Sequence, residues 1–164
     1  DVTELTDDDV DEMMRVNVKS ALYGMLAAVA HFKARGAGHV INVSSMLGRV
    51  PFVPVRAAYA GAKHFLNALT ANLRMELHGT GIHVTLVSPG LVATEFGVNA
   101  LHGGADSRAL PGAQPPEEVA EVIADVIERP RADVYTRPES AAQVAAYYAA
   151  EDLERHEQTL MQPR

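Results

Sequence analysis

The chain has 164 residues, of which 48% are hydrophobic and 21% charged, so its composition is that of one globular domain and excludes a disordered chain. A formal net charge of -7 argues against nucleic acid or an acidic membrane as a partner, and the absence of cysteine excludes disulfides and thiolate sites. The acidic start of the chain is not a signal peptide pattern, and the longest mostly apolar run, 21–32, is too short to span a bilayer. We therefore expect a cytoplasmic protein without a membrane partner.

The first predicted element is a long helix over 7–35. The segment from Thr6 to Asp9 resembles a helix start, because short oxygen-bearing side chains accept hydrogen bonds from free backbone N–H groups. Apolar residues then recur at helical spacing, and Gly36 follows the helix as a stop signal.

Short apolar strands then alternate with helices along the chain. A segment without clear periodicity, 94–114, is long enough to be a substrate lid. The remaining predicted elements are a strand at 39–43, a loop to about 56, a helix at 57–77, a strand at 83–87, a helix from about 115 to 129, a strand at 133–136 and a terminal helix at 140–161, within a C-terminal segment 138–164.

This alternation predicts an α/β fold in which helices cover a parallel sheet, all within a single domain 1–164. Ligands of such sheets bind beyond the carboxyl ends of the strands. Ser44 and Ser45 follow the strand at 39–43, and Ser88-Pro89-Gly90 follows the next strand. The organisation alone therefore places both segments at the predicted ligand edge.

Tyr59 and Lys63 lie four residues apart at the start of the helix over 57–77, so they share one helix face. A cation beside a phenol favours the phenolate, and we expect Lys63 to lower the pKa of Tyr59 far enough for proton transfer near neutral pH. Taken alone, the Tyr-x-x-x-Lys pattern is more often a surface or packing pair. The segments around it change this interpretation.

The stretch Val40-Ile41-Asn42-Val43-Ser44-Ser45-x-x-Gly48, then Tyr59-x-x-x-Lys63, then Pro89-Gly90-x-Val92-x-Thr94 resembles the short-chain dehydrogenase/reductase family. Asn17 matches the asparagine that this family carries on the helix before the serine strand, and the resemblance covers about residues 1 to 136. It implies a partial Rossmann-like, doubly wound parallel sheet with flanking helices and without its N-terminal strands.

The resemblance also implies roles for individual residues. Tyr59 corresponds to the general acid/base, and Lys63 to the residue that lowers the tyrosine pKa and binds the nicotinamide ribose. Ser45 corresponds to the serine that binds the substrate oxygen, with Ser44 as the less favoured alternative. Asn17 corresponds to the asparagine that anchors a relay water, although a buried amide joining helix to strand remains open. The residues expected around the nicotinamide carboxamide are Pro89, Gly90, Val92 and Thr94, where Pro89-Gly90 alone reads equally well as an ordinary turn.

The sequence departs from the family at its start. No glycine-rich turn follows a strand and opens a helix, as a pyrophosphate site requires, and the family's Asn-Ala-Gly motif is also missing. The chain begins with Asp1, and we expect it to be part of a longer enzyme whose strand at 39–43 has lost a neighbour and become an apolar edge. The alternative is a short non-catalytic module that acts in binding or oligomerisation.

The implied function is NAD- or NADP-dependent interconversion of a secondary alcohol and a ketone, with a small-molecule alcohol or carbonyl compound as substrate. The long helices 7–35 and 57–77 resemble those that pair between subunits in the family, so we expect a homodimer or homotetramer. The sequence leaves the substrate and the choice between NAD and NADP open. No metal site is expected, and His102 alone among the histidines is considered for substrate contact. The histidines read as structural or exposed are His31, His39, His64, His78, His83, His102 and His156.

Overall fold

A computed structural model describes residues 1–100, 102 and 104–161 of the chain. Its three-stranded parallel sheet has the order β1-β2-β3, with β1 at Gly38–Val43, β2 at Ile82–Ser88 and β3 at Asp133–Tyr135. The pairing of β1 with β2 runs from Gly38 opposite Ile82 to Val43 opposite Val87. Parallel strands need crossover connections, and here helices supply both of them. The expected α/β fold with a partial Rossmann-like sheet is therefore confirmed.

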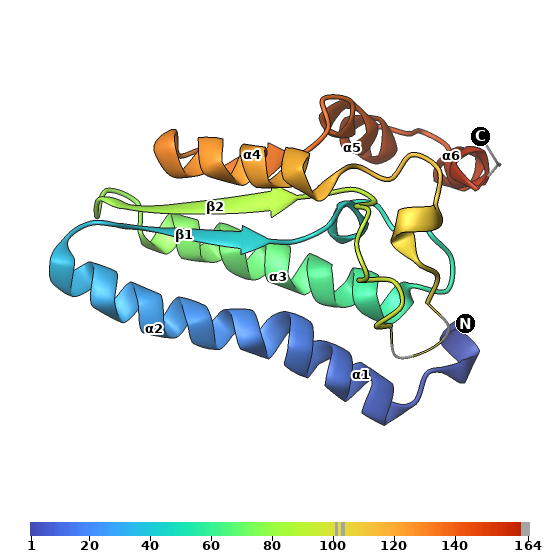
Figure 1. The fold of residues 1–164 in the computed structure, drawn as a ribbon, viewed down its shortest axis with the longest axis horizontal. Helices are drawn as coiled ribbons and strands as arrows, with labels where there is room; N and C mark the ends of the chain where they lie inside the picture. Colours follow the sequence, from blue (N-terminus) through green and yellow to red (C-terminus); the bar gives the residue numbers. More distant parts are fainter. Residues whose placement is uncertain (101, 103, 162–164) are drawn as a thin grey trace.

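Helices cover both faces of this sheet (Figure 1). Figure 1 shows α2 and α3 below the sheet and α4 above it, with α5 and α6 near the end of the chain. The helices are α1 at Asp7–Met14, α2 at Ser20–Arg35, α3 at Ala57–Glu76, α4 at Pro116–Glu128, α5 at Ser140–Tyr148 and α6 at Leu153–Leu160. In the part of the chain that the structure describes, no helix has both the length and the apolar character needed to cross a bilayer.

The helix predicted over 7–35 begins as expected but is not regular throughout. Thr6 and Asp9 form a reciprocal capping box at its start, and Gly36, with a φ of 74°, ends it in the left-handed region. A π-helical turn at Arg15–Lys19 separates α1 from α2. Near this turn, side chains donate to backbone carbonyls that in a regular helix accept from backbone N–H groups. Asn17 donates to the Met13 carbonyl, and Ser20 donates to the Val16 carbonyl.

The C-terminal segment 138–164 also differs from its prediction, because two helices replace the single one. Asp152 caps α6 by accepting from the backbone N–H of Arg155 at 3.0 Å, so a new helix starts where the alanine-rich stretch ends. The Tyr147 hydroxyl donates to Glu157 at 2.8 Å and holds α5 to α6. Residues 162–164 of this prediction, and residues 101 and 103 of the predicted lid, lie outside the described residues.

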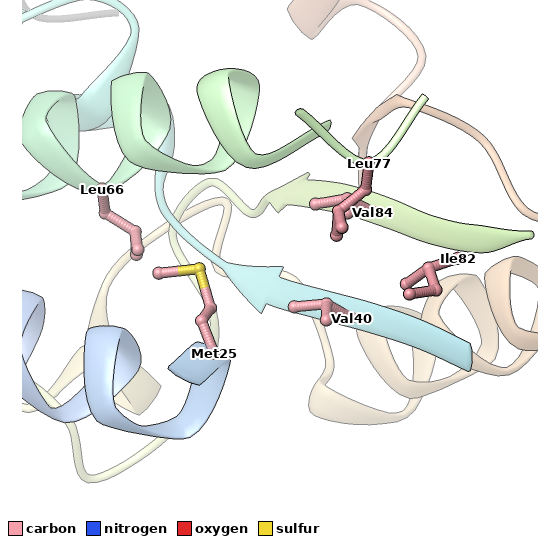
Figure 2. Packing of buried hydrophobic residues seen from close by; sticks show 6 residues of the cluster. All are labelled: Met25, Val40, Leu66, Leu77, Ile82 and Val84. Carbon is pink, nitrogen blue, oxygen red and sulfur yellow. The ribbon is translucent and has the colours of Figure 1, made fainter. Parts of the chain in front are cut away.

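The main apolar core lies between the sheet and the helices α2 and α3 (Figure 2). Its buried members come from α2, α3, β1 and β2 and the α3–β2 connection, and they are Met25, Val40, Leu66, Leu77, Ile82 and Val84. A polar bridge crosses the same interface, because the Asn42 amide donates to the Thr70 hydroxyl at 2.9 Å. Both side chains are buried, so this bridge also sets how β1 lies against α3.

Candidate active site

The segments that follow β1 and β2 are joined at the carboxyl edge of the sheet. The backbone N–H of Ser44 donates to the Val87 carbonyl at 2.7 Å, and that of Met46 donates to the Pro89 carbonyl at 2.7 Å. The loop after β1 is thus hydrogen-bonded both to β2 and to the segment that follows β2. The two segments singled out in the sequence, Ser44-Ser45 and Ser88-Pro89-Gly90, therefore lie side by side.

Tyr59 and Lys63 lie on the first two turns of α3, beside the same edge. The Lys63 Nζ atom is 5.6 Å from the centroid of the Tyr59 ring, and it donates a hydrogen bond to the Val43 carbonyl at 3.3 Å. Both side chains are half-buried. The predicted pair is thus held together at the end of β1, with the ammonium tied to the strand.

The protonation of this pair is governed mainly by burial. Burial raises the pKa of the Tyr59 phenol above its ordinary value, and hydrogen bonding with Ser45 and the positive charge of Arg56 oppose this only in part. Burial also lowers the pKa of Lys63. The net shift of the Tyr59 pKa is therefore opposite in direction to the one expected from Lys63, because loss of solvent disfavours the charged form of each group.

The two adjacent serines have different surroundings. Ser44 is buried, and its hydroxyl donates to the Asn67 Oδ1 atom at 2.5 Å. The Ser45 hydroxyl accepts from the backbone N–H of Leu47 at 3.1 Å, and it lies close enough to the Tyr59 phenol to oppose the rise in that group's pKa. Ser45 is therefore the serine that meets the tyrosine, while Ser44 joins its loop to α3.

Asn17 lies in the π-helical turn between α1 and α2. Its amide donates to the Met13 carbonyl at 3.3 Å and contacts the Met13 sulfur at 3.0 Å, both within its own helical segment. The structure therefore shows an amide that bonds locally rather than one that joins helix to strand. The turn itself packs against α3, the helix that carries Tyr59 and Lys63.

The segment after β2 runs back over the tyrosine. Val92 forms an isolated parallel bridge with Gln114, and the Thr94 hydroxyl accepts from the backbone N–H of Phe96 at 3.3 Å. The ring of Phe96 lies 5.8 Å from that of Tyr59. The predicted residues Val92 and Thr94 thus anchor a segment whose aromatic side chain reaches the candidate acid/base.

Gln114 anchors this segment to the strand beyond it. Its buried amide donates to the Thr136 carbonyl at 3.0 Å, and its Oε1 atom accepts from the Thr136 hydroxyl at 2.8 Å. The segment after β2 is thereby tied to the residue that follows β3. Sequence reasoning missed this residue, because a single glutamine in an aperiodic segment gives no local signal.

His102, the histidine that the sequence suggests for substrate contact, lies against Asp9 in the structure. Its Nε2 atom lies 2.6 Å from the Asp9 carboxylate, in the capping box of α1. The predicted lid is therefore tied to the start of the first helix. This carboxylate partner, distant in sequence by 93 positions, gives no sequence signal.

The residues present fit the nicotinamide end of a dinucleotide. The bond from Lys63 to the Val43 carbonyl uses one of three ammonium donors, which leaves two for hydroxyl groups of a ribose. Among the described residues, and apart from its two chain neighbours, Gly90 has no heavy atom within 4 Å of where a side chain would begin, so a flat ring could approach the backbone there. The sequence contains no glycine-rich phosphate turn to hold the other end.

Known proteins resemble this chain over most of its length. A family profile described as short chain dehydrogenase matches residues 1–103. An uncharacterised oxidoreductase of Staphylococcus saprophyticus is 40% identical over 91 residues, which are 54% of this chain and 37% of that protein. A dehydrogenase/reductase SDR family protein 7-like of Anopheles gambiae is 34% identical over 146 residues, covering 85% of this chain and 45% of its own length.

The fold has solved counterparts as well. A short-chain dehydrogenase from Burkholderia cenocepacia, in complex with NADP, superposes with a TM-score of 0.77 at 25% identity. The match covers 97% of this chain and 64% of that one. The chain thus spans less than half the length of the two relatives and under two thirds of the solved structure.

Proposed function

Since this chain belongs to the short-chain dehydrogenase family, we propose that it carries the proton-transfer site of an NAD- or NADP-dependent oxidoreductase that interconverts a secondary alcohol and a ketone. One observation carries the proposal: Tyr59, Lys63 and Ser45 lie together at the carboxyl end of β1. The NADP bound to the Burkholderia relative supports the choice of cofactor class.

The roles follow from the contacts of each side chain. A bound nicotinamide supplies or accepts the hydride. In the direction of reduction, the Tyr59 hydroxyl donates its proton to the carbonyl oxygen, and the Ser45 hydroxyl donates a hydrogen bond to the same atom. The raised pKa of Tyr59 keeps the phenol protonated, as a proton donor must be. Lys63 would hold the ribose through ammonium N–H groups other than the one that donates to the Val43 carbonyl.

Pro89, Gly90, Val92 and Thr94 are proposed to surround the nicotinamide carboxamide. They follow β2 directly, and the bridge from Val92 to Gln114 holds their segment at the edge of the sheet. Asn17 is proposed to hold a water of the proton relay. Its local hydrogen bonds to Met13 would have to be exchanged for that role, so it is the weakest member of the proposed set.

The test is a cofactor-dependent assay of the full-length protein. Change in nicotinamide absorbance is followed with a panel of secondary alcohols and ketones, alongside cofactor binding by calorimetry. We expect Tyr59→Phe to lower kcat by about 10²- to 10⁴-fold, the usual contribution of a general acid/base. Tyr23→Phe, at an exposed tyrosine of α2, is the matched control. An undiminished rate in Tyr59→Phe would refute the assignment, and absence of cofactor binding would favour a non-catalytic module.

A further inference from the structure

Asn67 lies on the same face of α3 as the candidate catalytic pair. It follows Lys63 by four residues and Tyr59 by eight, so the three side chains form one row along the helix. Its Oδ1 atom accepts from the Ser44 hydroxyl at 2.5 Å, and its Nδ2 atom donates to the Gly48 carbonyl at 2.6 Å. One amide therefore holds the loop after β1 at two points, one on each side of Ser45.

The loop and the helix are in tight contact at this place. A Cβ atom built on Gly48 would lie 2.9 Å from the Lys63 Cβ, 2.9 Å from the Ser44 hydroxyl and 3.0 Å from the Asn67 Nδ2. Contacts this short leave no space for a side chain at position 48. The loop that contains Ser45 is therefore seated directly on the turn of α3 between Lys63 and Asn67.

A second hydrogen bond holds β1 on α3 independently of the loop. The Asn42 amide donates to Thr70 at 2.9 Å, one helical turn beyond Asn67, and this bond anchors β1 itself. Apolar burial of Val40 and Leu66 secures the same interface. Loss of the Asn67 amide would therefore release the loop while β1 stays on α3.

We propose that Asn67 is a positioning residue that sets the Ser45 hydroxyl against Tyr59 by holding Ser44 and Gly48 on α3. The effect of Asn67 on catalysis rests on the proposed function. Its effect on the position of Ser45 does not. Asn67 itself need not touch substrate or cofactor. It acts through the loop, because hydrogen bonds on both sides of Ser45 fix the backbone that carries the hydroxyl.

The test measures the Tyr59 phenol directly in the full-length protein. NMR titration of the tyrosine ring carbon reports its pKa in wild type, Asn67→Ala, Ser45→Ala and the double variant. Since hydrogen bonding with Ser45 lowers the pKa of Tyr59, we expect both single variants to raise it and the double variant to raise it no further. The matched control is Asn72→Ala, because Asn72 is exposed on the same helix and its amide donates to the Ala68 carbonyl of that helix at 3.0 Å.

An unchanged or lowered tyrosine pKa in Asn67→Ala, in a folded protein, would overturn the proposal. If that variant does not fold, Ser44→Ala removes one of the two bonds and must raise the pKa in the same direction. Activity gives a separate readout: with the proposed function, kcat should fall by about 10²-fold from the misplaced hydroxyl while the KM for cofactor stays unchanged. A shifted pKa without any oxidoreductase activity would refute the function and leave the positioning role standing.

Discussion

The ring of Phe96 lies 5.8 Å from the ring of Tyr59, with an angle of 58° between the two planes. Phe96 is itself 63% exposed, so it covers the tyrosine from the solvent side. The two residues come from different parts of the chain, one from the segment after β2 and one from α3. Burial, which raises the pKa of Tyr59, is thus supplied in part by a side chain that can be removed without touching the helix.

We expect Phe96→Ala to lower the Tyr59 pKa toward its ordinary value, because the phenolate regains contact with water. In the pH profile of kcat, the limb that reflects the ionisation of Tyr59 should move to lower pH. Val98→Ala changes an exposed apolar side chain in the same segment and serves as the control. A limb that stays in place would show that Phe96 does not shield the phenol.

Asp9 should make the stability of the protein depend on pH under acidic conditions. Hydrogen bonds from the Thr6 backbone, from His102 and from the Thr6 hydroxyl lower its pKa from 3.8 to about 2. A carboxylate with a depressed folded-state pKa stabilises the fold above the unfolded value, and this contribution disappears as the pH falls through about 2.

The wild-type protein should therefore lose stability between pH values of about 4 and 2 more steeply than Asp9→Asn. Urea unfolding across this range measures the difference. Asp8→Asn removes a carboxylate from the same helical turn and controls for net charge. Parallel pH dependence in wild type and Asp9→Asn would contradict the assigned hydrogen bonds.

Arg49 joins the serine loop to the other two strands. Its guanidinium donates to the Ser88 hydroxyl at 3.3 Å, pairs with Asp133 and lies 5.5 Å from the Tyr135 ring centroid. We expect the pair with Asp133 to show a coupling energy of about 0.5 to 3 kcal/mol in a double-mutant cycle. Lysine at position 49 should not restore it, because an ammonium lacks the planar fork of donors.

The cycle uses Arg49→Ala, Asp133→Ala and the double variant, followed by chemical unfolding. The exposed pair of Arg129 with Asp125, on α4 and its C-cap, provides the comparison and should couple by no more than about 1 kcal/mol. Equal coupling in the two pairs would mean that the partly buried position of Arg49 adds nothing.

Leu66 tests the core beneath the site. Its side chain is 2% exposed and packs with Met25 and Val40 between α3 and β1. We expect Leu66→Ala to lower the free energy of unfolding by about 2 to 5 kcal/mol, because it opens a cavity in this layer. Ile127→Ala, 62% exposed on α4, should change it by no more than about 0.5 kcal/mol. Similar losses in both variants would contradict the burial of Leu66 between α3 and β1.

Local signals in the sequence predicted most of the elements. Thr6, Asp9 and Gly36 bound a helical stretch because capping and left-handed backbone depend on residues within one turn. The same signals failed to indicate the π-helical turn at Arg15–Lys19, where side chains compete for backbone carbonyls. They also failed to show the break between α5 and α6, since an alanine-rich stretch favours helix wherever nothing else competes.

The candidate site divides in the same way. The spacing of Tyr59 and Lys63 on one helix allows proton transfer, and the motifs around them, including Ser45 after a strand, made this interpretation specific through their resemblance to the family. Asn67 could have been found at the next helical turn after Lys63, whereas Phe96 lies beyond any local pattern. Contacts between segments far apart in sequence leave no periodicity by which they could be recognised.

The sequence by itself determined the alternation of strands and helices and the edge of the sheet where the candidate site residues lie. It also identified Tyr59 as the candidate acid/base. Only the tertiary structure decided which serine meets Tyr59 and in which direction the pKa of that tyrosine moves. Residue spacing reveals which groups can share a face, and this requires only the geometry of one helix or strand. Burial and hydrogen-bond partners depend on how separate segments pack, and packing exists only in the folded chain.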